Sequence, residues 1–176
     1  MLRTRVGYCG GTTKSPTYRS IGDHAETLQI DFDPTRISYE QLLEHFWTTH
    51  NPCRDAWSRQ YMSAVFYHNE AQREAIETTR RKFVTTPDQI KTEIAPLDTF
   101  WIAEDYHQKY RLRHERLLDD EMHAIYPSER DYVNSTAVMR LNGYLDGHGT
   151  KTQLAGEIDK LGLSTTAQEH LRKRAR

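Results

Sequence analysis

A chain of 176 residues has the length of one ordinary domain, enough to bury a hydrophobic core without disulfide or metal support. Its 24 basic and 25 acidic residues nearly cancel, so the composition gives no electrostatic reason to expect binding to nucleic acid or to an anionic membrane. Two cysteines are too few for a disulfide framework, and no apolar run is long enough to span a bilayer. We therefore expect a soluble protein of a reducing compartment, the cytoplasm.

The chain opens with two predicted strands. Residues 3–8 suit a short strand, and the glycines, threonines, serine and proline that follow are typical of a loop. Residues 25–32 alternate between polar and apolar side chains, which predicts a second strand with an apolar face. That face would consist of Leu28, Ile30 and Phe32.

Helices and strands then alternate. A capping box at Ser38 and Gln41 predicts a helix over 38–49, and Asn69 caps a second helix that ends near Phe83. Short strands are expected at 64–67 and 92–95. This order indicates an α/β or α+β fold, a mixed sheet with helices packed on it.

The last third of the chain is charged and has helical periodicity. A helix is expected from residue 103 to 116, with Tyr106 and Tyr110 packed inward from one face. We assign residues 1–114 to the α/β domain and 115–176 to a helical extension packed on it.

Glu26 is the first candidate for chemistry. It shares the apolar face of its strand, so burial would favour the protonated carboxyl that a general acid requires. The simpler interpretation is a strand-end carboxylate in water. Tyr18 and Tyr61 are the next candidates, since a phenol can donate a hydrogen bond to a polarised oxygen. Taken alone, each is better explained as an ordinary core or surface aromatic.

Neither cysteine has the sequence surroundings expected of a catalytic nucleophile. Cys9 lies beside Gly10 and Gly11, whose N–H groups would favour a thiolate, but no basic residue is adjacent to it. Cys53 precedes Arg54, a better electrostatic setting, and neither cysteine has a metal-ligand or Cys-x-x-Cys spacing. An inert thiol is the competing interpretation for both, and no metal site is expected.

These residues belong to a longer series of motifs, found in one order along residues 3–112. The motifs are Gly7-Tyr8-x-Gly10-Gly11, Pro16-Thr17-Tyr18, Gly22-Asp23-His24-Ala25-Glu26, Ile37-Ser38-Tyr39-Glu40-Gln41-Leu42-Leu43, Phe46-Trp47-x-x-His50-x-Pro52, Gln60-Tyr61-x-Ser63-Ala64 and Ala103-Glu104-Asp105-Tyr106-His107-Gln108-x-Tyr110. Together they resemble the A-type peptide methionine sulfoxide reductases, which reduce the S epimer of methionine sulfoxide.

The resemblance implies a chemistry and a fold. In the family a cysteine thiolate attacks the sulfoxide sulfur, and a glutamate equivalent to Glu26 protonates or hydrogen-bonds the leaving oxygen with help from tyrosines equivalent to Tyr18 and Tyr61. His24 and Asp55 are added as candidate substrate contacts. The fold would be the family's ferredoxin-like core, and the external reductant a thioredoxin-like thiol, with no bound cofactor.

This chain departs from the family at the nucleophile. The family's thiol lies in a Gly-Cys-Phe-Trp motif upstream of the glycine-rich turn, and neither Cys9 nor Cys53 matches it. We therefore expect an N-terminally truncated reductase that lacks the first strand and helix of the core and has little or no activity as written. With that segment restored, a one-cysteine mechanism would survive mutation of Cys53 to serine.

Two other possibilities stay open. One is a non-catalytic module that binds oxidised methionine through Glu26, Tyr18 and Tyr61. The other is a reductase in which Cys9 has been recruited as a relocated nucleophile.

Overall fold

The computed structural model describes residues 1–175, and the chain divides into two compact units. One unit is formed by residues 6–103, and the other by residues 1–5 together with the chain from Glu104 onward. The helical part therefore starts before the expected boundary at residue 115. Hydrogen bonds explain why the N-terminal residues join it, since Lys109 Nζ donates to Thr4 O at 2.5 Å and Thr136 Oγ1 donates to Leu2 O at 2.6 Å.

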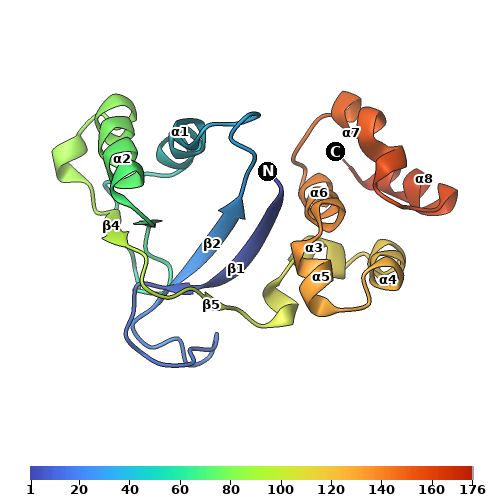
Figure 1. Ribbon diagram of the computed structural model, residues 1–176, viewed down its shortest axis with the longest axis horizontal. Coiled ribbons are helices and arrows are strands. Elements are labelled where there is room, and N and C mark those ends of the chain that lie inside the picture. The colour runs from blue at the N-terminus through green and yellow to red at the C-terminus, as the bar shows by residue number, and fades with distance from the viewer. Residues whose placement is uncertain (176) are drawn as a thin grey trace. The chain divides into compact units, whose positions relative to one another are not determined.

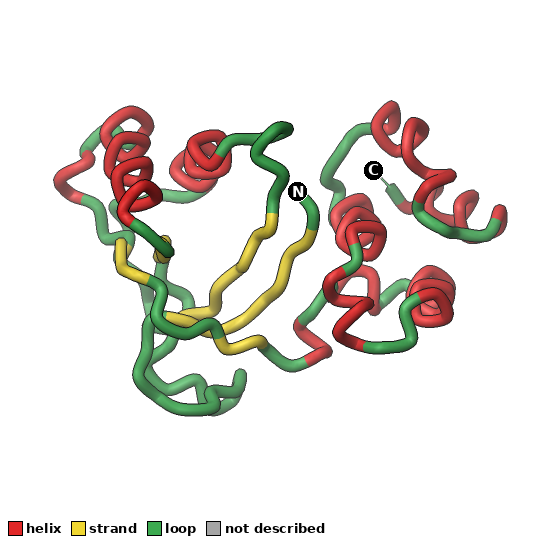
Figure 2. The backbone as a smooth tube through the Cα atoms, in the orientation of Figure 1, coloured by secondary structure: helices red, strands yellow, loops and turns green. Residues whose placement is uncertain are grey.

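The strands of the α/β unit lie in two sheets (Figures 1 and 2). The three-stranded sheet has the order β2-β1-β5, formed by β2 (Ala25–Asp31), β1 (Arg3–Cys9) and β5 (Trp101–Ile102). Strand β1 runs antiparallel to β5, with Tyr8 opposite Trp101. The second sheet pairs β3 (Ala64–Tyr67) in parallel with β4 (Glu93–Pro96).

Four of these strands were predicted, and β5 was not. At two residues β5 is too short to produce a period in the sequence, and its pairing with β1 defines it. The prediction of a mixed α/β fold is confirmed, although the described strands form two sheets where one was expected.

Two helices pack together in this unit, α1 (Tyr39–Thr49) and α2 (Glu70–Phe83). The Ser38 capping box and the Asn69 cap form as predicted. The buried residues of one hydrophobic cluster come from these helices and from the residue that follows α2: Leu43, Trp47, Ile76 and Val84. A short 3-10 helix, η1 (Pro87–Gln89), precedes β4.

The apolar face of β2 is less buried than the alternation predicts. Leu28 is 55% exposed and Ile30 is half-buried, whereas Ala25 on the opposite face is buried. The residues from Glu26 to Ile30 line a cavity of about 430 Å³ between β2, α1 and β3. The apolar face of the strand therefore borders this cavity.

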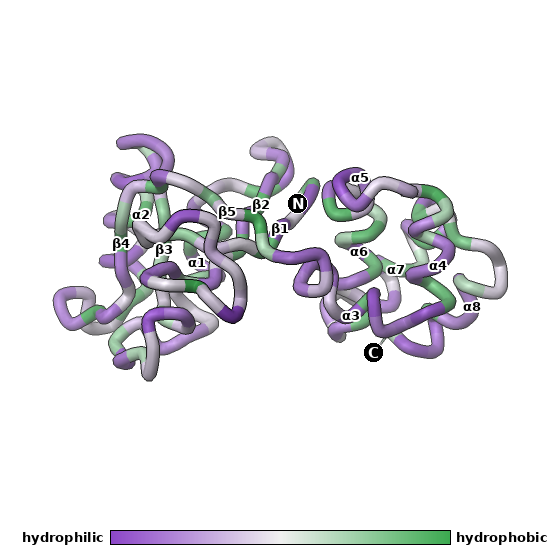
Figure 3. Tube along the Cα trace, turned by 90° about the horizontal axis from the view of Figure 1, so that it is seen from below, coloured by the Kyte–Doolittle hydropathy of each residue, from purple (hydrophilic) through white to green (hydrophobic). Residues whose placement is uncertain are grey.

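The second unit is helical (Figure 1). Its elements are η2 (Asp105–His107), α3 (Tyr110–Arg113), α4 (Arg116–Ile125), α5 (Glu129–Asn134), α6 (Thr136–Leu145), α7 (Lys151–Glu157), η3 (Ile158–Lys160) and α8 (Thr165–Arg174). Hydrophobic and hydrophilic stretches alternate along these helices (Figure 3), and the apolar residues form one core around Leu118, Met122 and Leu141. Within residues 1–175, no helix is long and apolar enough to cross a membrane.

The helix predicted over 103–116 is broken. Lys109 adopts a left-handed conformation with φ of 53°, which ends η2 before α3 begins. The expected stripe of Tyr106 and Tyr110 therefore does not form, and the two side chains are 55% and 54% exposed. The prediction that they pack inward is wrong.

Candidate active site

Glu26 is half-buried at the start of β2 and is held by Gln60 through two hydrogen bonds. The Glu26 backbone N–H donates to Gln60 O at 2.9 Å, and Gln60 Nε2 donates to Glu26 Oε1 at 2.7 Å. Oε1 of the carboxyl therefore has a hydrogen-bond donor within the protein. The structure thus orients the carboxyl that the sequence singled out.

The two predicted tyrosines lie together beside this carboxyl. Their hydroxyl oxygens are 3.1 Å apart, and Gln60 Nε2 also donates to Tyr61 Oη at 3.2 Å. The hydrogen bond with Tyr18 raises the pKa of Tyr61 to about 12, with smaller contributions from desolvation and from the negative charge of Glu26. Tyr18, Tyr61 and Glu26 therefore form one hydrogen-bonded group whose central link is Gln60.

Gln60 belongs to the motif Gln60-Tyr61-x-Ser63-Ala64, but the sequence did not predict it as a site residue. Its position directly before Tyr61 was the available signal. The role could not be read from that position, because Glu26 and Gln60 meet only through the tertiary fold.

His24 supports the glycine-rich loop. It is 1% exposed, its Nδ1 accepts the N–H of Gly11 at 3.1 Å, and its Nε2 lies 2.8 Å from Thr13 O. These contacts define the neutral tautomer with the proton on Nε2, which donates to the carbonyl. Both ring nitrogens are thus used inside the loop, so the structure offers no polar atom of His24 for the substrate contact that we expected.

Asp23 holds the same loop from its other side. Its two carboxylate oxygens accept from the backbone N–H groups and hydroxyls of Thr12 and Thr13 at 2.8 to 3.0 Å. These donors keep the pKa of Asp23 well below its usual range. Gly22 is required beside it, because its φ is +63° and a Cβ there would lie 2.2 Å from Thr13 Oγ1.

Arg59 connects this loop to β4. Its Nε donates to Asp23 O at 3.0 Å, and its two terminal nitrogens reach Gly10 O at 2.9 Å and Glu93 Oε2 at 2.7 Å. Because Arg59 directly precedes Gln60, these contacts also help to fix the backbone that carries Gln60. The sequence analysis missed Arg59, since its partners are far away in the chain.

Asp55 is not joined to this group by its observed contacts. Its side chain is 84% exposed, and its ion pair is with Lys91 at 3.6 Å. The structure therefore gives Asp55 a surface position and gives no support to the expected substrate contact.

Cys9 is fully buried at the end of β1 and lines the same cavity as Glu26. Burial raises the pKa of its thiol to about 11, and a hydrogen bond with Thr27 offsets only part of that effect. Cys53 is half-buried, with its Sγ 3.3 Å from Thr86 Oγ1. Burial thus disfavours the thiolate form of Cys9 near neutral pH.

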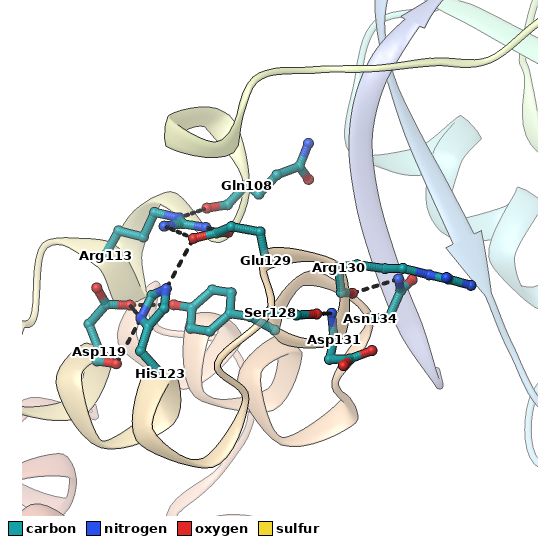
Figure 4. Close-up of polar contacts among 10 residues, drawn as sticks. Gln108, Arg113, Asp119, His123, Ser128, Glu129, Arg130, Asp131 and Asn134 are labelled. Atoms are coloured by element: carbon teal, nitrogen blue, oxygen red, sulfur yellow. Dashed lines mark hydrogen bonds and ion pairs between the residues drawn. The ribbon is translucent and has the colours of Figure 1, made fainter.

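A second polar cluster lies in the helical unit (Figure 4). Arg113 pairs with Glu129 at 2.6 Å, and His123 lies 3.2 Å from the same carboxylate. His123 also stacks on Tyr132, whose hydroxyl donates to Asp119. These mutual contacts join α3, α4 and α5, which indicates a structural role. Across the described chain, no group of three or more His, Cys, Asp or Glu side chains is placed to hold a metal ion.

Comparisons with known proteins agree with the motifs. The sequence profile of a family described as peptide methionine sulfoxide reductase matches residues 1–140. A Drosophila melanogaster peptide methionine sulfoxide reductase is 39% identical over 173 residues, covering 97% of this chain and 69% of the relative. Peptide methionine sulfoxide reductase MsrA of Methanococcoides burtonii is 44% identical over 122 residues, covering 62% of this chain and 80% of the relative. The crystal structure of Mxr1 from Saccharomyces cerevisiae in its reduced form superimposes on this chain with a TM-score of 0.58 and 26% sequence identity. The match covers 64% of this chain and 71% of the Mxr1 chain.

Proposed function

We propose that this chain, which belongs to the peptide methionine sulfoxide reductase family of oxidoreductases, binds the sulfoxide oxygen of oxidised methionine through Glu26, Tyr18 and Tyr61. The contact of Gln60 with both Glu26 and Tyr61 carries this proposal, because it directs a carboxyl and two phenols to one place. Such a group suits a polarised oxygen that accepts hydrogen bonds and then a proton.

The reaction that this group serves is the thiol-dependent reduction of the S epimer of methionine sulfoxide, free or within a protein. A thiolate attacks the sulfoxide sulfur and the sulfur–oxygen bond breaks, which releases methionine and leaves the oxygen on the thiol as a sulfenic acid. A second thiol displaces that oxygen as water and forms a disulfide, which a further thiol of a thioredoxin-like protein or dithiothreitol reduces. Glu26 supplies a proton to the oxygen, and the phenols stabilise its developing charge.

A second function is favoured by the burial of Cys9. Because its thiol has a pKa of about 11, we do not assign Cys9 as the attacking thiolate. A chain that retains the oxygen-binding group but has no reactive thiol beside it would recognise oxidised methionine and release it unchanged. Binding without turnover is therefore the alternative to reduction.

One assay separates the two functions. The S and R epimers of N-acetylmethionine sulfoxide are each incubated with the protein and dithiothreitol, methionine formation is measured by chromatography, and binding is measured by NMR titration. Turnover of the S epimer that Glu26→Gln abolishes supports the reductase, and binding of the S epimer without turnover supports the recognition module. If neither epimer binds nor reacts, both proposals are overturned.

Matched variants make the assay specific. Tyr61→Phe removes one proposed hydrogen bond to the oxygen, whereas Tyr106→Phe changes an exposed phenol of the other unit and leaves binding unchanged. Cys9→Ala and Cys53→Ala, each tested alone, identify any contribution of the two thiols to turnover.

A further inference from the structure

A second cavity, of about 420 Å³, lies in the helical unit. Its volume is typical of small-molecule sites, but its lining differs from the mostly apolar lining of such sites. Five of the six described lining residues are polar or charged, and two of them are arginines. They come from α3 and the turn after it, from the end of α6 and from the end of α8: Arg111, His114, Glu115, Leu145, Asp146 and Arg174.

Each arginine is held by a carboxylate through one part of its guanidinium group. Arg111 Nε donates to Asp146 Oδ1 at 2.6 Å. Arg174 Nε and Nη2 both donate to Glu115 Oε1, Nε at 2.9 Å. Within residues 1–175, the two terminal nitrogens of Arg111 and Nη1 of Arg174 have no hydrogen-bond partner. The carboxylates thus fix both side chains and leave terminal N–H groups for a ligand.

The charges around this cavity favour an anion. Glu115 is already engaged, since it also accepts from His170 Nε2 at 3.0 Å, and the hydrogen bond with Arg174 lowers its pKa. The last turn of α8 adds Arg172 and Lys173 beside Arg174 and contains no acidic residue. Taken together, the lining and this turn hold four cationic side chains against two carboxylates, which attracts anionic ligands.

His114 supplies one further nitrogen. Its Nδ1 lies 2.7 Å from Tyr110 O and donates to that carbonyl, which leaves Nε2 as the ring nitrogen available to a ligand. Nε2 accepts the hydrogen of a monoprotonated phosphate, or donates to a phosphate oxygen when the ring is charged. A tetrahedral phosphate group has enough oxygens to use both arginines and this nitrogen, whereas a carboxylate has only two oxygens and suits a single guanidinium.

We propose that this cavity binds the phosphate group of a small phosphomonoester, or free phosphate, through the terminal nitrogens of Arg111 and Arg174 together with His114. The proposal does not depend on the proposed function. Every lining residue of this cavity belongs to the helical unit, whereas the oxygen site belongs to the α/β unit.

The test titrates the protein with inorganic phosphate, glycerol phosphate and acetate and follows the arginine Nε–H signals by ¹⁵N NMR. The ionic strength is kept constant, so that binding is separated from screening of the surface charges. Both phosphates should give saturable shifts of the Arg111 and Arg174 signals. Acetate should bind about tenfold more weakly, because it has fewer oxygens to accept from the two arginines.

Arg111→Gln is the deciding variant. It should weaken phosphate binding about tenfold, because it removes a charged donor. It breaks one exposed ion pair, so the fold should survive, which circular dichroism and thermal melting verify. Arg111→Lys keeps the charge without the planar fork and should recover only part of the affinity. Arg116→Gln is the matched control, since Arg116 also forms an exposed ion pair in the helical unit but does not line the cavity.

The results decide between a phosphate site and a solvated cluster of ion pairs. Saturable binding that Arg111→Gln weakens and Arg116→Gln does not weaken supports the site. Tighter binding of glycerol phosphate than of inorganic phosphate then identifies a phosphomonoester as the ligand, and the reverse order identifies free phosphate. Shifts that do not saturate, equally tight binding of acetate, or equal losses in the two glutamine variants overturn the proposal. None of these results bears on the oxygen site, whose assay uses methionine sulfoxide.

Discussion

The hydroxyl oxygens of Tyr18 and Tyr61 lie 3.1 Å apart, although all of β2 and α1 separates the two residues in the chain. One phenol donates to the other, and Gln60 Nε2 donates to Tyr61 Oη at 3.2 Å. The same amide donates to Glu26 Oε1 at 2.7 Å, so Gln60 links the pair of phenols to the carboxyl of Glu26.

Tyr61 should ionise later than an ordinary tyrosine. Its pKa is raised to about 12, chiefly by the hydrogen bond with Tyr18, so its phenol should stay neutral at pH 11. Tyr18→Phe removes that bond and should bring the pKa of Tyr61 down towards 10. Titration of ¹³Cζ-labelled tyrosine by NMR measures the change, with Tyr110→Phe as a control. An unchanged titration of Tyr61 in Tyr18→Phe would contradict the assigned hydrogen bond.

The two cysteines should differ in reactivity. Burial raises the pKa of Cys9 to about 11, so only about one thiol in a thousand is a thiolate at pH 8. Cys53 is partly exposed and should react first with iodoacetamide at pH 8. Peptide mapping by mass spectrometry should find Cys9 modified only once urea unfolds the protein. Rapid modification of Cys9 in the native protein would reopen its candidacy as nucleophile.

Lys109 should make the protein more stable as the pH rises. Its ammonium group is buried near Arg5 and Arg113, which lowers its pKa from 10.5 to about 8. Between these two values the unfolded chain binds more protons than the folded one, so the free energy of unfolding increases with pH. The increase assigned to this residue is on the order of 3 kcal/mol between pH 7 and pH 11.

The variant Lys109→Met isolates that effect. The free energy of unfolding is measured in urea at several pH values for both proteins. From pH 7 to pH 10 it should increase more for the wild type than for Lys109→Met. Lys91→Met, which removes an exposed lysine, should leave the wild-type pH dependence intact. A parallel pH dependence of wild type and Lys109→Met would refute the burial effect.

The buried indole of Trp47 should depend on Thr79. Trp47 Nε1 donates to Thr79 Oγ1 at 3.1 Å, and the two residues are 2% exposed. Thr79→Val keeps the side-chain shape but leaves that N–H unsatisfied, so the free energy of unfolding should fall by about 1 to 3 kcal/mol. Thr79→Val also removes the bond from Thr79 Oγ1 to Ala75 O within α2. Thr48→Val is the control, because it removes the matching bond from Thr48 Oγ1 to Glu44 O at an exposed position of α1, and it should cost much less. Equal losses in urea unfolding would show that burial of the indole N–H is not the cause.

Local signals account for what could be predicted. The caps at Ser38 and Asn69 and the alternation that begins at Ala25 identified α1, α2 and β2 almost to the residue. Each of these signals depends only on residues within a few positions of one another, so it can be read from the sequence alone. The order of the motifs was likewise enough to indicate the family that the comparisons then showed.

The tertiary structure decided the rest. Gln60, Arg59 and His24 took their roles from partners outside their own segments of the chain. Lys109 has a left-handed backbone between η2 and α3, and its ammonium donates to Thr4 O, 105 residues away in the chain. By itself the sequence determined four of the five described strands, the helices α1 and α2, the family and the candidates Glu26, Tyr18 and Tyr61. Which polar atoms meet was settled only by folding, because a buried donor or acceptor pairs with whatever group the packing brings to it, at any distance along the chain.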